Sequence, residues 1–118
     1  MTAQNTIKLK RGDVLFEEDG KAESIYLIQS GRVVLFITRG QTRLQLGDLK
    51  TTGIAGVEAA FGAKKYSMGC EADATTEVIQ IPVAAAKAQL DSASNFVKLV
   101  LKSQSDQIKS QLTDIKNL

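Results

Sequence analysis

Short apolar runs separated by turn residues extend from Ile7 to about Ile81, and this spacing constrains the fold more than any other feature of the chain. Runs rich in β-branched and aromatic residues, bounded by glycine and polar clusters, are typical of β-strands. The clearest of them are Ser24–Gln29 and Arg32–Arg39. The spacing therefore favours a β-sandwich or β-barrel for this part of the chain.

Glycine and polar residues mark the turns between these predicted strands. Ser30-Gly31 has the composition of a hairpin turn between the two clearest strands. The other predicted turns are Arg11-Gly12-Asp13, Glu17-Glu18-Asp19-Gly20, Arg39-Gly40-Gln41-Thr42 and Gly47-Asp48. The remaining predicted strands are Arg43–Leu46, Tyr66–Ala72 and Thr76–Ile81.

The pattern changes its period at Pro82, the only proline. Val83–Leu90 is rich in alanine and predicts a short helix, and Asp91–Asn95 supplies N-cap residues for a second one. That second helix is expected to be long and amphipathic from Phe96 onward. Its apolar stripe consists of Leu101, Ile108, Leu112 and Ile115. The first half of the stripe could pack on the chain's own β core, whereas the second half is expected to pair with a partner helix in a homodimer.

Composition excludes several classes of function. The 118 residues carry a net charge of +2, which is too small to indicate a nucleic-acid partner, and they contain no histidine and one cysteine, Cys70. Without histidine, most hydrolase triads, zinc sites and other metal-dependent chemistry become improbable, so we expect neither an enzyme nor a metal. We find no apolar run long enough to span a membrane and no signal peptide, and we expect a cytoplasmic protein.

One segment, Thr51–Met68, has the residues needed to hold a phosphorylated sugar. Gly53 and Gly56 allow the backbone to approach a ligand, and Val57–Phe61 predicts a short helix whose free N–H groups face an anion. Glu58 would repel a phosphate, so we expect it to accept hydrogen bonds from sugar hydroxyls. The segment therefore predicts a site for a ribose phosphate, although Glu58 also fits an ordinary position on a helix surface.

The chain resembles the cyclic-nucleotide-binding domain of catabolite-activator-type regulators, protein-kinase regulatory subunits and nucleotide-gated channels. The residues that carry the resemblance are Gly12-Asp13, Leu15-Phe16, Gly20, Ile25-Tyr26-Leu27-Ile28, Gly31, Val33 and Thr76-Glu77-Val78-Ile79. The resemblance implies a mainly β fold, an antiparallel β-roll over residues 1–95, followed by C-terminal helices. Residues 96–118 would then form the long helix that dimerises and leads to an effector domain.

In this family a phosphate-binding cassette lies between two strands of the roll. Gly56-Val57-Glu58-Ala59-Ala60 resembles its opening, with one additional residue between glycine and glutamate. The resemblance implies that Glu58 binds the ribose 2′-hydroxyl and that the amides of Val57–Ala60 receive the phosphate. Tyr66-Ser67 stands where the family has arginine and serine, so the arginine is missing.

Lys64 and Lys65 lie next to this position and could supply charge, but an ammonium group cannot form the two-pronged grip of a guanidinium. Without a ligand, the two lysines would be a solvated pair in a loop, and Ser67 would be an ordinary strand residue. The expected ligand-binding residues are therefore Gly56, Val57, Glu58, Ala59, Ala60, Lys64, Lys65, Tyr66 and Ser67.

Two functions follow from the resemblance. The first is a regulatory sensor that binds a cyclic mononucleotide, with cyclic AMP preferred, and passes the signal through the C-terminal helix. The second is a degenerate member that has lost the ligand and acts as a dimerisation or protein-interaction module. The sequence ends within the helical pattern at Asn117-Leu118, so we expect a longer protein with an effector domain beyond it.

Overall fold

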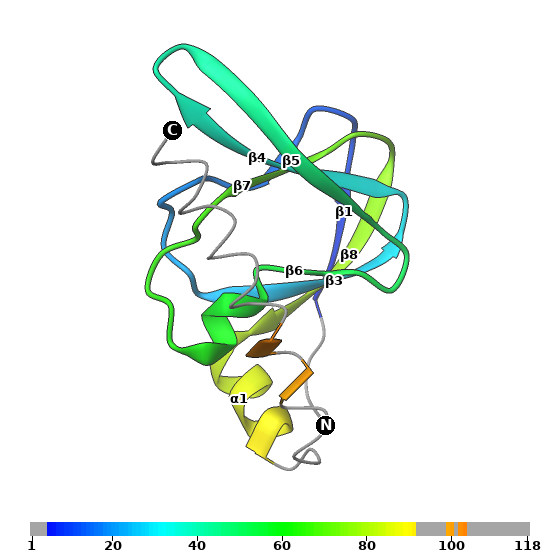
Figure 1. Ribbon diagram of the computed structural model, residues 1–118. Coiled ribbons are helices and arrows are strands. Elements are labelled where there is room, and N and C mark those ends of the chain that lie inside the picture. The colour runs from blue at the N-terminus through cyan, green and yellow to red at the C-terminus, as the bar shows by residue number, and fades with distance from the viewer. Residues whose placement is uncertain (1–4, 92–98, 101, 104–118) are drawn as a thin grey trace.

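The described residues form two antiparallel four-stranded sheets that face each other around an apolar core (Figure 1). The computed structural model describes residues 5–91, 99–100 and 102–103. Its elements are β1 Asn5–Leu9, β2 Val14–Phe16, β3 Ser24–Ser30, β4 Arg32–Arg39, β5 Thr42–Lys50, β6 Ile54–Ala55, the 3₁₀ helix η1 Val57–Phe61, β7 Gly69–Ala72, β8 Thr76–Pro82 and α1 Val83–Asp91.

The first sheet has the strand order β1-β8-β3-β6, and the second has the order β2-β7-β4-β5. Along β3, Ser24, Tyr26 and Ile28 are buried while the residues between them are partly exposed, which is the alternation of a strand with one face toward the core. The fully buried centre of the roll includes Ile28, Val33 and Val78. The predicted antiparallel β fold with a helix after Pro82 is therefore confirmed.

The expected dimer stripe and the C-terminal end of the chain cannot be compared with the structure in the same way. Leu101, Ile108, Leu112 and Ile115 lie outside the described residues, as does the expected helix start at Phe96. Within the described ranges, no helix is long and apolar enough to cross a lipid bilayer.

Ser30-Gly31 does not form the predicted hairpin turn. It connects β3 to β4, but these strands belong to different sheets: β3 pairs with β6 and β8, while β4 pairs with β5 and β7. The turn therefore carries the chain from one sheet to the other. Gly31 has a φ of +89° and lies very close to Thr75 and Thr76 at the start of β8. A glycine in this conformation suits a hairpin turn as well as a connection between two sheets, so the turn residues alone do not decide which strands pair.

Gly47-Asp48 is not a turn either, and β5 continues to Lys50. The register of β5 on β4 shifts between Leu35 and Phe36, because Leu35 pairs with Gly47 and Phe36 with Gln45. A β-bulge of this kind inserts one residue and bends the strand without ending it. By contrast, Gly40 and Gln41 form the predicted turn between β4 and β5, where Arg39 pairs with Thr42.

Replacing Gly31 with alanine is expected to destabilise the roll by about 3 kcal/mol, from backbone strain and overpacking together. A Cβ atom at this position would lie 2.4 Å from the carbonyl oxygen of Thr75 and 2.4 Å from Oγ1 of Thr76. Gly12→Ala is the matched control, because Gly12 has a similar φ of +94° and nothing within 4 Å of such a Cβ. Urea unfolding of both variants measures the difference, and equal losses would contradict the predicted contact.

Candidate functional site

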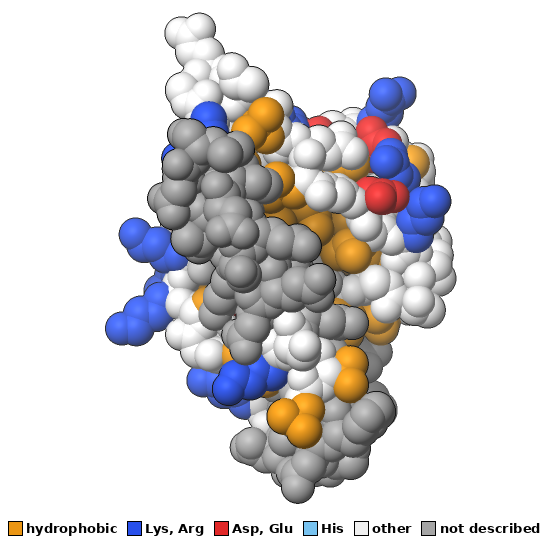
Figure 2. Space-filling view, in the orientation of Figure 1, with side chains coloured by type: hydrophobic (Ala, Val, Ile, Leu, Met, Phe, Trp, Pro, Cys, Tyr) orange, Lys and Arg blue, Asp and Glu red, His pale blue; other side chains and the backbone are white. Residues whose placement is uncertain are grey.

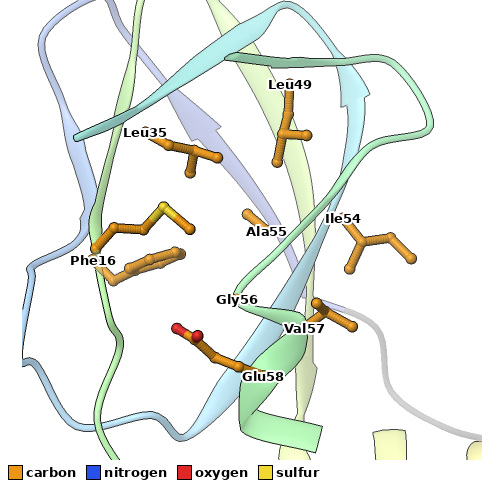
Figure 3. Close-up of a pocket in the computed structure, with 9 residues that line it drawn as sticks. Phe16, Leu35, Leu49, Ile54, Ala55, Gly56, Val57 and Glu58 are labelled. Atoms are coloured by element: carbon orange, nitrogen blue, oxygen red, sulfur yellow. The ribbon is translucent and has the colours of Figure 1, made fainter. Parts of the chain in front are cut away.

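A small pocket opens between the two sheets, next to η1. Its lining residues are Phe16, Leu35, Leu49, Ile54, Ala55, Gly56, Val57, Glu58 and Met68, and its volume is about 50 Å³. Figure 3 shows Phe16, Leu35 and Leu49 around the hollow, with the Glu58 carboxylate projecting toward Phe16 from η1. Apart from Glu58, the lining side chains are apolar.

Among the described lining residues Glu58 is the single charged one, and only 4% of its surface is exposed. Its two carboxylate oxygens are both hydrogen-bonded by Ser67: the backbone N–H donates to Oε1 at 2.8 Å, and the hydroxyl donates to Oε2 at 2.6 Å. A buried carboxylate needs such donors, because an unpaired charge is costly away from water. The fold thus brings together two of the predicted site residues that are nine positions apart.

Tyr66 is also buried, at 3% exposure, but it does not line the pocket. Its ring stacks on Phe16 with a centroid separation of 3.9 Å, and its hydroxyl donates to the carbonyl oxygen of Ser24 at 2.5 Å. The ring also fills the space beneath Gly56, since a Cβ there would lie 2.9 Å from Cε1 of Tyr66. Tyr66 therefore closes the wall behind Phe16, and burial raises the pKa of its phenol to about 12.

Lys64 and Lys65 are exposed and are not among the pocket residues. Their backbone runs along the turn before β3: Lys64 accepts a hydrogen bond from the N–H of Ala22 at 2.9 Å, and Lys65 forms an isolated bridge with Lys21. On the face shown in Figure 2, hydrophobic side chains are visible toward the middle, while most lysine and arginine side chains lie toward the margins. No positive side chain lies in the described lining of the pocket.

The backbone of Gly56–Ala60 takes the predicted form of a turn leading into a short helix. Gly56 has a left-handed conformation with a φ of 75°, and the N–H of Ala59 is bonded to its carbonyl at 3.0 Å. Gly56 and Val57 line the pocket, whereas Ala59 and Ala60 are buried beside it. The amide of Ala59 therefore already has a partner within the chain.

Two other kinds of chemistry find little support in the described part of the chain. No group of three or more acidic, cysteine or histidine side chains is placed to hold a metal ion there. Cys70 is fully buried in β7, and burial raises the pKa of its thiol to about 12, so the reactive thiolate is scarce at neutral pH.

The sequence did not predict the apolar lining of the pocket, because the predicted site was built from the glycine and polar residues of Thr51–Met68. The residues missed are Phe16, Leu35, Leu49, Ile54, Ala55 and Met68. They come from strands β2, β4, β5 and β6 and from the segment before β7, so only the three-dimensional pairing brings them together. Their one sequence signal is that each sits in or beside an apolar run, which most core residues share.

Comparison with known protein families gives a match over most of the chain. The family model for the cyclic nucleotide-binding domain matches residues 6–93. No curated protein matches the chain.

Solved structures with the same fold include three informative examples. A cAMP-bound form of the EAL enzyme Bd1971 has a TM-score of 0.76 at 20% identity, covering 95% of this chain and 30% of that chain. The sensor domain of the transcriptional regulator DNR from Pseudomonas aeruginosa has a TM-score of 0.77 at 15% identity, covering 94% of this chain and 75% of that one. A cyclic nucleotide-binding-like protein from Brucella abortus is 27% identical with a TM-score of 0.66, covering 75% and 77% of the two chains. This chain thus spans less than a third of the EAL enzyme in its cAMP-bound form.

Proposed function

Because the chain belongs to the cyclic nucleotide-binding domain family, whose members are regulatory ligand-sensing modules, we propose that it binds cyclic AMP and relays that binding to its C-terminal helix. In this proposal the segment is a regulatory module without catalysis. The homodimer through Leu101, Ile108, Leu112 and Ile115, a cytoplasmic location and an effector domain beyond Leu118 are parts of the same proposal.

The observation that carries the proposal is the buried Glu58 at the start of η1, facing Ser67 beside an apolar pocket. In the proposed complex Glu58 accepts the ribose hydroxyl, and the phosphate takes the Ser67 donors together with the amides of Gly56, Val57 and neighbouring residues. Ligand binding would therefore exchange the Glu58–Ser67 hydrogen bonds for bonds to the nucleotide. In this exchange both Ser67 donors regain an acceptor and Glu58 regains a donor, which limits its net cost.

A route from the site to the C-terminal helices is supported by packing. α1 contacts η1 and β3, Ala86 of α1 is 4% exposed, and the N–H of Val83 donates to the carbonyl of Glu23 at 2.9 Å. Any ligand that shifts η1 would thus act on α1 directly. Such coupling requires the ligand to bind two helix poses with different free energies.

A second candidate function is favoured by Tyr66. Its ring stacks on Phe16, and its hydroxyl is hydrogen-bonded to the backbone of Ser24. Tyr66 stands at the position where the family's arginine would hold the phosphate. A domain that keeps the fold but binds no nucleotide would act as a dimerisation or protein-interaction module. Even under the first proposal, the missing bidentate contact is expected to weaken nucleotide affinity by about ten- to a hundredfold.

Thermal unfolding of the full chain with cyclic AMP, cyclic GMP and linear AMP separates the two candidates. A ligand present at about 100 times its Kd stabilises the folded state by about 2.7 kcal/mol, which raises Tm by roughly 10 °C in a domain of this size. We expect cyclic AMP at millimolar concentration to raise Tm more than cyclic GMP, and AMP to have little effect. An unchanged Tm with all three nucleotides would favour the second candidate.

A further inference from the structure

We propose that the pocket beside η1 also binds a small, uncharged, apolar molecule with no sugar or phosphate group. The inference concerns the pocket walls alone and does not depend on nucleotide binding. Seven of its nine lining residues have apolar side chains, contributed by Phe16, Leu35, Leu49, Ile54, Ala55, Val57 and Met68.

The Glu58 carboxylate needs no hydrogen bond from a ligand. Both carboxylate oxygens of Glu58 already accept hydrogen bonds from Ser67, at 2.8 and 2.6 Å. A ligand that entered without polar groups would leave these bonds in place. A negative charge placed against the apolar walls, away from the amides of Gly56 and Val57, would have no positive side chain in the described lining to compensate for its lost hydration.

Water is a poor occupant of such a space. A bound water needs about two to four polar partners, and engineered cavities lined by leucine, isoleucine and phenylalanine stay dry and take up benzene or xenon. Here the lining side chains other than Glu58 are hydrocarbon, sulfur and an aromatic ring, so water against these side chains loses hydrogen bonds that an apolar molecule would not need. Displacing it is therefore favourable.

The size and walls of the pocket fit a ligand of a few heavy atoms. At about 50 Å³ the pocket is larger than the roughly 10 to 15 Å³ that one water-sized sphere occupies and about a third of the roughly 150 Å³ of an engineered cavity that holds benzene, so a ligand as large as benzene would extend toward the pocket opening. Phe16 provides one wall and is held from behind by Tyr66 at 3.9 Å. Met68 is buried in the lining, and its unbranched thioether can adjust to an aromatic guest.

The test uses benzene as the probe and the methyl groups of the full chain as reporters. In ¹H–¹³C spectra, we expect benzene to shift the methyl signals of Leu35, Leu49, Ile54, Val57 and Met68 in a saturable manner. Benzoate, which adds one negative charge, should bind at least about tenfold more weakly because its carboxylate must be desolvated beside Glu58.

Leu49→Phe and Leu35→Phe fill the pocket from two different strands and should each abolish the benzene shifts. Leu44→Phe is the matched control: Leu44 lies on the same strand as Leu49, but it is exposed and is absent from both the pocket lining and the buried clusters. This control variant should still bind benzene. Folding of each variant is checked by its amide spectrum.

Three outcomes would overturn the proposal: no saturable shift in the parent chain, equal shifts in Leu49→Phe and parent, or benzoate binding as tightly as benzene. A pocket already filled by the chain's own residues beyond 91 would give methyl contacts to those residues and no benzene shift, which also overturns it. Failure of cyclic AMP to bind would leave the benzene result unaffected. The two proposals can therefore fail separately.

Discussion

Replacing Tyr66 with alanine is expected to lower the free energy of unfolding by about 3 to 5 kcal/mol, the usual cost of removing a buried aromatic ring. The ring is 3% exposed, stacks on Phe16 and fills the space beneath Gly56. A loss of this size lowers Tm by roughly 10 to 20 °C. Urea unfolding followed by circular dichroism measures it.

Tyr66→Phe is the control that separates the ring from the hydroxyl. It keeps the stacking and removes the bond to the Ser24 carbonyl, so we expect a smaller loss of about 1 to 2 kcal/mol. A Tyr66→Ala variant as stable as Tyr66→Phe would show that the ring does not support the wall of the pocket.

Alkaline pH provides an independent measure of the same burial. The pKa of Tyr66 is raised to about 12 from an ordinary value of 10.0, so the unfolded chain loses this proton first. The stabilising contribution is complete below pH 10 and is lost as the pH rises toward 12. Stability of the parent should therefore fall more steeply across this range than that of Tyr66→Phe, and parallel curves would contradict the assigned burial.

Replacing Glu58 with alanine is expected to remove most of the Tm increase that cyclic AMP produces. In the proposed complex Glu58 anchors the ribose hydroxyl, and a hydrogen bond to a charged group contributes about 1.5 to 3 kcal/mol. That amount corresponds to a loss of affinity of about ten- to a hundredfold. The quantity to compare is the ligand-induced shift of each variant relative to its own unliganded Tm, because the substitution also removes the Ser67 hydrogen bonds.

Lys65→Ala is the comparison variant for this experiment. Lys65 is exposed and lies outside the pocket lining, so its substitution should reduce the cyclic AMP shift much less than Glu58→Ala does. Identical ligand-induced shifts for Glu58→Ala and the parent would contradict the role proposed for Glu58.

Local patterns predicted most of the strands because alternation and turn residues act over a few positions, although the strand expected over Tyr66–Ala72 begins only at Gly69. The strand run of β3, the turn at Gly40 and the helix after Pro82 all have such local causes. The pairing of strands has no such local cause, because Ser30-Gly31 suits a hairpin and a connection between sheets equally. The bulge beside Gly47 was not predicted for the same reason, because it is defined by the register of β5 on β4.

The candidate site was predictable in its polar part and hidden in its apolar part. Glu58 stood out because it is the lone acid in a glycine- and alanine-rich segment, and Ser67 followed from the resemblance. Burial of Tyr66 could not be foreseen, because a tyrosine suits a core or a surface and only packing against Phe16 decides between them. Leu35 and Leu49 became pocket residues through tertiary pairing alone.

The most direct measurement of the central claim is a titration of the ¹⁵N-labelled full chain with cyclic AMP, followed through the amide signals of Gly56, Glu58 and Ser67. The Ser67 amide reports the exchange itself, since its N–H is held by Glu58 at 2.8 Å without ligand. We predict saturable shifts that are largest at these three amides and far smaller with linear AMP. Unchanged amide signals at millimolar cyclic AMP would contradict nucleotide binding by this domain.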